Sequence, residues 1–392
     1  MAKYPLSSTT WDHSEIQAIN EVIESGNFTM GLQVAEFEKE FASYAGGKYS
    51  VMVNSGSSAN LVLLSACRYM KEPRFNPGDE IIAPAVSWST TYYPIDQNGA
   101  TIKFVDISSD SLNIDVSKIE EAITSRTKAI FVVNLLGNPA DWEALEKIAQ
   151  EYNLTLLEDN AESLGGAIGS KKLGTFGFGG THSTFFSHHM STMEGGLVVT
   201  DDEVLYQTMK SVRAHGWTRD LPDQNHVYNK TGSRWDDLFR FVIPGYNLRP
   251  LEIEAAIGRM QLKKLPNFID ARRKNAAYFL DQTKSISSVS TQVENGSSSW
   301  FGFSLVLKDK YLGKRAKLLE ILESAEIESR PIVTGNFTRN PVIKHLSHAP
   351  LEKYPSADLI HDNGLFVGNH HYDLKDKIDL LCEALADFER SI

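Results

Sequence analysis

Two adjacent histidines, His188 and His189, lie in a polar run that ends at a Glu-Gly-Gly turn and a new apolar segment. An imidazole has an ordinary pKa of about 6.5, so it can take up and return protons at neutral pH. This run could therefore supply a general base. A pair of surface histidines without a catalytic role explains the same residues, and the run alone does not decide between the two.

A second run, residues 54–60, consists of Asn-Ser-Gly-Ser-Ser-Ala-Asn between an apolar segment and a helical pattern. Small residues let the backbone N–H groups of Gly56, Ser57 and Ser58 approach an anion, and the start of a helix adds partial positive charge. A phosphate could bind there. An ordinary helix N-cap has the same residue types, so both interpretations stay open.

A third run, residues 157–163, places Asp159 at the end of an apolar segment. A carboxylate in that position can hydrogen-bond the protonated nitrogen of a pyridine ring and keep the ring in its electron-accepting form. It can also cap a following helix without any ligand. The base, the anion site and the acid can act together only if the fold brings them to one place.

The scaffold that would do so is predicted by an alternation of apolar, β-rich runs with helical patterns. This alternation is typical of an α/β domain with a mostly parallel sheet, in which ligands bind outside the carboxyl ends of the strands. The expected strands cover residues 50–56, 79–87, 101–107, 128–135 and 154–161, and the expected helices cover residues 57–70, 117–124 and 140–152.

A second region begins near residues 243–250, where Pro and Gly break the pattern. A long amphipathic helix is expected at 251–283, interrupted only at Pro266. Beyond it the chain is typical of a small α+β domain. We therefore predict a large domain at 1–246, which includes the N-terminal segment, and a small C-terminal domain at 247–392.

Composition excludes several classes of function. The 392 residues are 42% hydrophobic and 23% charged, as in an ordinary globular protein, and the net charge of −11 without a basic stripe argues against nucleic acid. We see no secretory signal and no apolar stretch long enough for a bilayer. The only cysteines, Cys67 and Cys382, cannot form an iron–sulfur site and favour the cytoplasm. His370 and His371 lack a third ligand, so we expect a solvated loop and no metal.

Taken together and in this order, the three runs resemble the sugar-nucleotide aminotransferase family of pyridoxal-phosphate enzymes. The resemblance extends over nearly the whole chain and includes residues 26–46, 215–220 and 245–265. It implies a fold-type I transferase, like aspartate aminotransferase, with a mostly parallel mixed sheet in the large domain and a small α+β domain.

The resemblance also shows that a lysine is missing. In this family the lysine that binds the cofactor covalently lies six residues before the Glu of the Glu-Gly-Gly turn. Counting back from Glu194 leads to His188, and no lysine occurs between Lys172 and Lys210. A displaced lysine therefore does not explain the difference.

The matching positions imply a cofactor site that two subunits share. Gly56, Ser57 and Ser183 would bind the phosphate of pyridoxal phosphate. Asn247 would reach the same phosphate from the second subunit, so the resemblance implies a homodimer.

Three further positions would contact the cofactor ring. Trp88 would stack on the pyridine, although a core aromatic is its simpler interpretation. Asp159 would pair with the ring nitrogen. Glu162 would lie near the ring hydroxyl, where many members of the family have Gln, and this difference leaves the protonation at that oxygen open.

Histidine in place of the lysine implies deoxygenation rather than amino transfer. An imidazole moves protons but forms no stable imine, so the cofactor would be held noncovalently, resting as pyridoxamine phosphate. The resemblance implies removal of the C3 hydroxyl from a GDP-linked 4-keto-6-deoxy sugar, on the route to colitose in the lipopolysaccharide O-antigen. L-glutamate would donate the amino group, and ammonia and 2-oxoglutarate would be released. His188 would be the base, while His215 would assist it or be structural.

Three alternatives remain. A nucleotide-sugar 4-aminotransferase would keep the amino group on its product, but it needs the missing lysine. A 3-dehydratase with an iron–sulfur cluster needs more than two cysteines, and a scaffolding homologue would retain only the fold. For the substrate diphosphate or a carboxylate, Arg219, Arg249 and Arg330 are equal candidates, because a guanidinium pairs bidentately with both groups.

Overall fold

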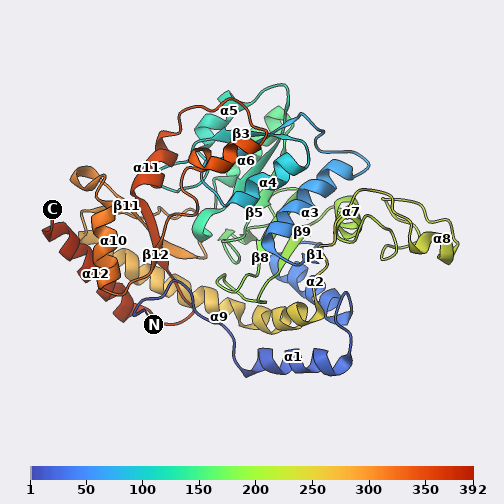
Figure 1. Ribbon diagram of the computed structural model, residues 1–392, viewed down its shortest axis with the longest axis horizontal. Helices are drawn as coiled ribbons and strands as arrows, with labels where there is room; N and C mark the ends of the chain where they lie inside the picture. The colour runs from blue at the N-terminus through green and yellow to red at the C-terminus, as the bar shows by residue number, and fades with distance from the viewer. Residues whose placement is uncertain (1) are drawn as a thin grey trace.

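The computed structural model describes residues 2–392 and is built around a seven-stranded sheet (Figure 1). The strand order is β1-β9-β8-β5-β4-β2-β3, and β9 alone runs against its neighbours. The mixed, mostly parallel sheet expected from the sequence is thus confirmed. The strands are β1 (Tyr49–Val53), β2 (Glu80–Pro84), β3 (Thr101–Val105), β4 (Thr127–Val133), β5 (Thr155–Asp159), β8 (Gly179–Ser183) and β9 (Gly196–Thr200).

Helices cover both faces of this sheet, because successive strand residues point to opposite sides. In β1, Val51 and Val53 pack on the side of α3, whereas Met52 packs on the side of α2 and α9. The helices are α1 (His13–Ser25), α2 (Leu32–Ala45), α3 (Gly56–Tyr69), α4 (Ser89–Gln97), α5 (Ile119–Ala122), α6 (Trp142–Tyr152), α7 (Glu203–Arg213), α8 (Arg234–Leu238), α9 (Glu252–Gln282), α10 (Arg315–Ser324), α11 (Pro355–Asn363) and α12 (Lys375–Arg390).

The long helix α9 runs across the lower part of the molecule in Figure 1, above α1, and is continuous. The expected interruption at Pro266 is therefore wrong. A proline inside a helix removes one backbone hydrogen bond and crowds the preceding turn. The buried side chains of Leu265 and Ile269 flank it and hold this part of α9 against the core of the large sheet.

A second sheet lies toward the C-terminus. Its four strands are antiparallel in the order β10-β11-β13-β12, and α10 and α12 pack against each other beside it. These strands are β10 (Val289–Ser290), β11 (Gly302–Leu307), β12 (Ser329–Arg330) and β13 (Gly364–Gly368), and the short hairpin of β6 (Ala167–Ile168) and β7 (Lys171–Lys172) stands apart.

The two predicted domains contribute residues to each other's cores. Tyr4 is fully buried in the core of the small sheet, where its hydroxyl donates to the carbonyl of Gly368 at 2.6 Å. Ile332 and Ile360 pack into the core of the large sheet. The boundary between residues 246 and 247 therefore stays a prediction.

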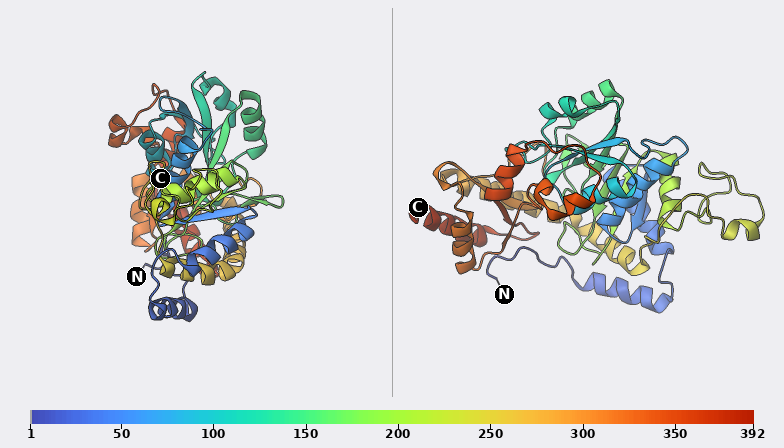
Figure 2. Two further views of the ribbon diagram at one scale, coloured as in Figure 1. Left: turned by 90° about the vertical axis from the view of Figure 1, so that its right-hand side faces the viewer. Right: turned by 45° about the horizontal axis from the view of Figure 1, so that its top comes forward.

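The segment between α7 and α9 projects from the body and carries α8 at its tip, as both Figure 1 and Figure 2 show. In the described residues 2–392, no helix has the length and apolar character needed to cross a membrane, and no cluster of ligating side chains could hold a metal ion. His370 is only 1% exposed and its Nε2 is 2.8 Å from the carbonyl of Pro5. The expectation of a solvated loop is wrong for this histidine.

Candidate active site

The start of α3 meets the end of β8 at the carboxyl edge of the sheet. Ser55 caps α3 by accepting the N–H of Ser58 at 3.1 Å, which places Gly56 and Ser57 in the first turn with unpaired N–H groups. A Cβ on Gly56 would lie 2.5 Å from the Cβ of Ser183. Glycine therefore permits this approach. Free amides beside two hydroxyls at a helix N-terminus suit a phosphate.

Asp159 lies at the carboxyl end of β5 and is 4% exposed. Its Oδ2 accepts hydrogen bonds from Asn60 Nδ2 and Thr91 Oγ1, both at 2.8 Å, and its Oδ1 accepts the N–H of Ala161 at 3.1 Å. Burial raises the pKa of Asp159, and these hydrogen bonds oppose the rise. Asp159 caps no helix, so the N-cap interpretation is wrong. A buried, oriented carboxyl of this kind suits a protonated ring nitrogen.

Trp88 precedes α4 and is 57% exposed, so its interpretation as a core aromatic is wrong. The first turns of α4 connect it to the groups described above. Thr90 accepts the hydroxyl of Ser57 at 3.0 Å, and Thr91 donates to Asp159. An exposed indole two and three residues before these threonines could give the site one flat aromatic face.

Glu162 lies three residues beyond the end of β5. Its Oε2 accepts the N–H of Leu136 at 3.1 Å, and Leu136 holds a left-handed backbone with φ of 53°. Burial, with a smaller contribution from the charge of Asp159, raises the pKa of Glu162 to about 7, although the hydrogen bond from Leu136 opposes the rise. This carboxyl therefore holds its proton to a higher pH than an ordinary glutamate does.

His188 is held by a backbone carbonyl. Its Nδ1 lies 2.6 Å from the carbonyl oxygen of Ala161, and a carbonyl can only accept, so Nδ1 carries the proton and Nε2 keeps a lone pair. Burial lowers the pKa of His188 to about 4, and the charge of Arg272 contributes to the lowering. The rings of Phe185 and Phe301 lie edge-on at 6.0 and 5.2 Å between centroids. His188 is therefore a neutral imidazole with one free basic nitrogen.

His215 and Asn247 lie together, and the neighbouring Leu248 accepts the N–H of Asn54 at 3.1 Å. His215 has a left-handed backbone with φ of 63°, and its N–H donates to Tyr246 at 2.7 Å. Asn247 is exposed and its Oδ1 accepts Arg249 Nε at 2.9 Å. Within the described chain, no hydrogen bond joins either side chain to Asp159 or His188. A role for Asn247 toward a neighbouring subunit remains a prediction.

The candidate arginines differ in their surroundings. Arg219 stacks over the ring of Trp217 at 3.8 Å, Arg249 is engaged by Asn247, and Arg330 is exposed on β12. None is singled out by a contact with the residues around Asp159.

Several functional partners escaped the sequence analysis. Asn60 and Thr91 lie within or beside the runs that were considered, and their amide and hydroxyl groups could have suggested partners for a buried acid. Leu136 and Ala161 act through backbone groups, which no residue type reveals. Arg272 is 4% exposed and donates to the carbonyls of Phe301 and Asn369 at 3.0 and 2.7 Å, and nothing in the amphipathic pattern of α9 distinguishes it.

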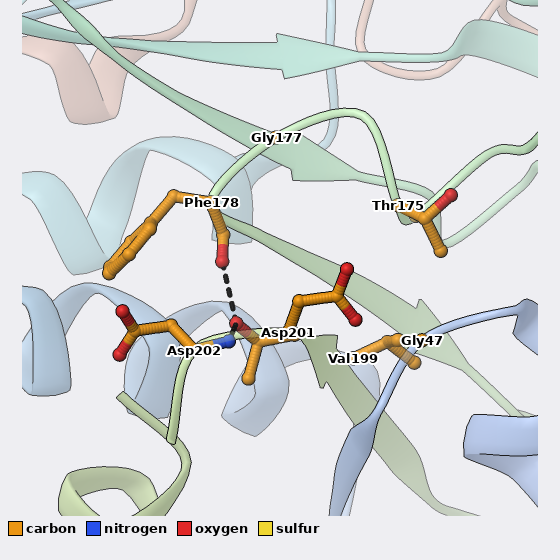
Figure 3. A pocket seen from close by; sticks show the side chains of 9 residues that line it. Gly47, Thr175, Gly177, Phe178, Val199, Asp201 and Asp202 are labelled. Atoms are coloured by element: carbon orange, nitrogen blue, oxygen red, sulfur yellow. Dashed lines mark hydrogen bonds between the residues drawn. The ribbon is translucent and has the colours of Figure 1, made fainter. Parts of the chain in front are cut away.

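A surface hollow of about 290 Å³ lies elsewhere, at the amino ends of β1 and β8 (Figure 3). Gly47, Phe178 and Asp201 line it, and the hydroxyl of Thr200 donates to the carbonyl of Phe178 across it at 2.7 Å. Because the predicted residues gather at the opposite, carboxyl edge of the sheet, this hollow is not part of their site.

The chain is similar to known proteins along almost its whole length. The model of the DegT/DnrJ/EryC1/StrS aminotransferase family matches residues 9–386. The chain is 51% identical over 387 residues to a GDP-4-keto-6-deoxy-D-mannose 3-dehydratase of Yersinia pseudotuberculosis, covering 98% of each chain. It is 52% identical over 387 residues to the protein of the same name from Escherichia coli O55:H7, covering 98% of this chain and 100% of the relative.

The structure also superimposes on a solved one. A crystal structure of a GDP-4-keto-6-deoxymannose-3-dehydratase with a trapped PLP–glutamate geminal diamine aligns with a TM-score of 0.95 at 51% identity. The alignment covers 98% of this chain and 100% of that chain.

Proposed function

The chain belongs to the DegT/DnrJ/EryC1/StrS aminotransferase family, and from this premise we propose that it is a pyridoxal-phosphate-dependent 3-dehydratase of GDP-4-keto-6-deoxy-D-mannose. It removes the C3 hydroxyl and gives GDP-4-keto-3,6-dideoxy-D-mannose. The product belongs to the route to colitose in the lipopolysaccharide O-antigen. The relatives with this name cover the chain almost from end to end.

One observation carries this proposal. The position of the family's lysine holds His188, whose Nδ1 is engaged by the Ala161 carbonyl and whose Nε2 is free. A lysine amine can both bind an aldehyde and move a proton, whereas an imidazole moves the proton only. The site therefore keeps acid–base chemistry and gives up covalent anchoring of a cofactor.

The residues at the carboxyl edge fit the cofactor. The first turn of α3 with Gly56 and Ser57 would hold its phosphate together with Ser183, and Asp159 would hold its ring nitrogen. In its amine form, pyridoxal phosphate supplies an amino group for the sugar ketone and an electron-accepting ring. Trp88 would cover one face of the ring.

His188 and Glu162 supply the proton chemistry beside that ring. Nε2 of His188 would take up a proton from the carbon that carries the cofactor's amino group and so act as a general base. It would then give this proton to the departing C3 hydroxyl and so act as a general acid. The Ala161 carbonyl retains the proton on Nδ1 throughout. Glu162, with its pKa raised to about 7 by burial, can keep a proton near the ring hydroxyl.

L-glutamate is the proposed amino donor, with release of 2-oxoglutarate and later of ammonia. This follows the related crystal structure, which holds a PLP–glutamate geminal diamine. We also place the reaction in the cytoplasm, and the two free cysteines, Cys67 and Cys382, are consistent with a reducing compartment.

The active protein is proposed to be a homodimer with shared sites. The projecting segment between α7 and α9 supports this, because Trp235, Phe239 and Phe241 are 82, 63 and 59% exposed. Exposed aromatic groups of this size are typical of association surfaces. Asn247 lies between the projecting segment and α9, and its amide would contribute to the partner's phosphate site.

The proposal is tested by turnover. The purified protein is incubated with pyridoxal phosphate, L-glutamate and a panel of nucleotide-linked 4-keto-6-deoxy sugars. We expect 2-oxoglutarate, ammonia and loss of the C3 hydroxyl, and we expect the GDP-linked mannose derivative to react fastest. Borohydride should not fix the cofactor to the chain.

A nucleotide-sugar 4-aminotransferase is the alternative outcome of the same assay. That reaction would leave nitrogen on the sugar, without release of ammonia, and mass spectrometry of the sugar product distinguishes the two. Retained nitrogen at C4, or failure to release 2-oxoglutarate with every sugar, would overturn the proposal.

A further inference from the structure

His189 is a fully buried imidazole next to the proposed base. Its Nε2 lies 3.1 Å from the carbonyl oxygen of Ser299, so Nε2 carries the proton, and its Nδ1 has no hydrogen-bond partner among the described residues. Burial and the charge of Arg272 hold the pKa of His189 well below its ordinary value. Two adjacent neutral histidines are thus fixed in opposite tautomers by carbonyls from two different parts of the fold.

The carbonyl that binds His189 comes from the segment leading into β11 of the small sheet. The N–H of Ser299 donates to Gly137 at 2.9 Å, and the N–H of Phe301 donates to Leu136 at 3.0 Å. Leu136 in turn donates to Glu162. Residues 299–301 therefore lie between the turn that holds Glu162 and the loop that holds His188.

The aromatic ring of Phe301 packs against both histidines. Its ring centroid is 5.2 Å from that of His188 and 5.7 Å from that of His189. The loop itself is closed by backbone bonds, from Thr184 to Gly195 and from Thr192 to Thr184, each at 2.9 Å. From this closed loop, the side chain of His189 extends to the segment before β11 and hydrogen-bonds the carbonyl of Ser299.

We propose that His189 is a positioning residue, which holds the His188 imidazole in place by hydrogen-bonding the backbone of Ser299. This inference rests on the proposed function, in which His188 is the base. In a lysine-bearing relative, a covalent bond to the cofactor also fixes the loop. Without that bond, the loop needs another anchor, and His189 provides one through the peptide it shares with His188.

Two amide substitutions at position 189 test whether the hydrogen bond to Ser299 matters or whether any polar side chain is sufficient. In the holoenzyme, His189→Gln places an amide N–H near the position of Nε2, whereas His189→Asn ends one methylene short of Ser299. We expect H189Q to keep kcat within a few-fold and H189N to lower it by about 10²-fold, as for a reacting group displaced by about 1 Å. KM and cofactor affinity should change little. His189→Leu, which fills the space without a donor, should resemble H189N.

A second readout follows the His188 loop without catalysis. Hydrogen–deuterium exchange of residues 184–192 should be faster in H189N than in wild type and near wild type in H189Q. The same variants should differ in the acidic limb of kcat/KM. A loosened loop admits water, so the pKa of His188 rises from about 4 toward its ordinary value and activity is lost at a higher pH.

The groups that face this loop are the same in all these variants. They are Arg272 from α9, whose charge lowers the pKa of both histidines, and Arg273, whose charge lowers that of His189. A change in the acidic limb between H189Q and H189N therefore reports on the anchor rather than on a new charge.

His370 offers a matched control. It is 1% exposed, and its Nε2 also meets a backbone carbonyl, that of Pro5, at 2.8 Å. His370→Asn should lower the thermal midpoint without lowering kcat. If H189Q falls as far as H189N, or if H189N keeps kcat and loop protection, the inference is overturned. If instead the wild-type protein dehydrates no sugar, the proposed function fails, while the exchange data still test the anchor.

Discussion

The carbonyl of Ala161 decides which nitrogen of His188 can act as a base. Because a carbonyl cannot donate, the proton stays on Nδ1 and the reactive lone pair is confined to Nε2. Burial then keeps the imidazole neutral by lowering its pKa to about 4. One backbone oxygen thereby sets the tautomer, and the surrounding apolar rings keep the imidazole uncharged.

His188→Asn should separate cofactor binding from turnover. The asparagine amide can still donate to Ala161, but it has no basic nitrogen. We expect kcat to fall by about 10²- to 10⁴-fold, the usual contribution of a general base, with cofactor affinity retained. Release of 2-oxoglutarate and cofactor absorbance measure the two quantities. Full activity of H188N would show that another group is the base.

Glu162→Gln should flatten the pH dependence of stability in the cofactor-free protein. The pKa of Glu162 is raised from 4.5 to about 7 by burial, so the folded state binds its proton more tightly than the unfolded chain. That contribution to stability is present below pH 4.5 and is lost as the pH rises toward about 7. Glutamine does not titrate. Urea unfolding midpoints measured from pH 4.5 to 7.5 should therefore fall less in E162Q, and equal slopes would contradict the expectation.

At the scale of residues, side-chain chemistry was easier to predict than backbone chemistry. The position of Asp159 at the carboxyl edge follows from the expected strand 154–161, whereas β8, which ends at Ser183, was not among the expected strands. The roles of the carbonyls of Ala161 and Ser299 could not be predicted, because every residue has a carbonyl and only the fold determines which one meets a histidine. The exposure of Trp88 was also hidden, since a tryptophan after an apolar strand is equally suited to a core.

At the scale of elements, one carboxylate joins the starts of two helices. Glu252, the first residue of α9, is 3% exposed and accepts the N–H groups of Gly31, Gln33 and Val34 at the start of α2, at 2.9, 2.8 and 2.9 Å. These are amides that a helix cannot pair internally, and negative charge is favourable beside them.

Glu252→Ala should therefore destabilise the protein by about 2 to 4 kcal/mol, because three amides at the N-terminus of α2 lose a charged acceptor. Glu252→Gln keeps one oxygen and should cost about half as much. Urea denaturation followed by circular dichroism gives both values. Lys39→Ala, on the exposed side of α2, is the control and should stay within about 0.5 kcal/mol of wild type. A loss no larger in E252A than in K39A would rule out the cross-helix cap.

The elements themselves were largely predictable, and their pairing was not. The expected strand 154–161 encloses β5, and the expected strand 128–135 covers β4 except its first residue, because a buried parallel strand has a continuous apolar run. The insertion of β9 between β1 and β8 depends on contacts distant in sequence. The continuity of α9 through Pro266 depends on buried neighbours, which a local rule for proline does not include.

At the scale of the whole molecule, the projecting segment suggests how a second copy completes the site. His215 and Asn247 lie at its two ends in the chain, and among the described residues no hydrogen bond joins their side chains to His188 or Asp159. If Asn247 serves the partner's phosphate, each site is built from two chains. Each site would then take His188 from one chain and Asn247 from the other.

Mixing two inactive variants should restore activity. His188→Asn removes the proposed base, and Asn247→Ala removes the proposed phosphate contact from the partner. A heterodimer of the two has one site with both defects and one site with neither, so random exchange of subunits should restore about a quarter of wild-type activity. Turnover after mixing, with sedimentation to confirm the dimer, measures this. Activity that stays at the level of the separate variants would place Asn247 in the site of its own chain, or outside any site.

The contact between Gly56 and Ser183 also limits how this chain can change over evolutionary time. Since a Cβ at position 56 would overlap the Cβ of Ser183, α3 cannot accept a larger residue at position 56 unless position 183 changes too. A descendant with alanine at 56 would need glycine at 183, which would also remove one hydroxyl. The two positions are therefore expected to covary, although they are far apart in the sequence and belong to different elements.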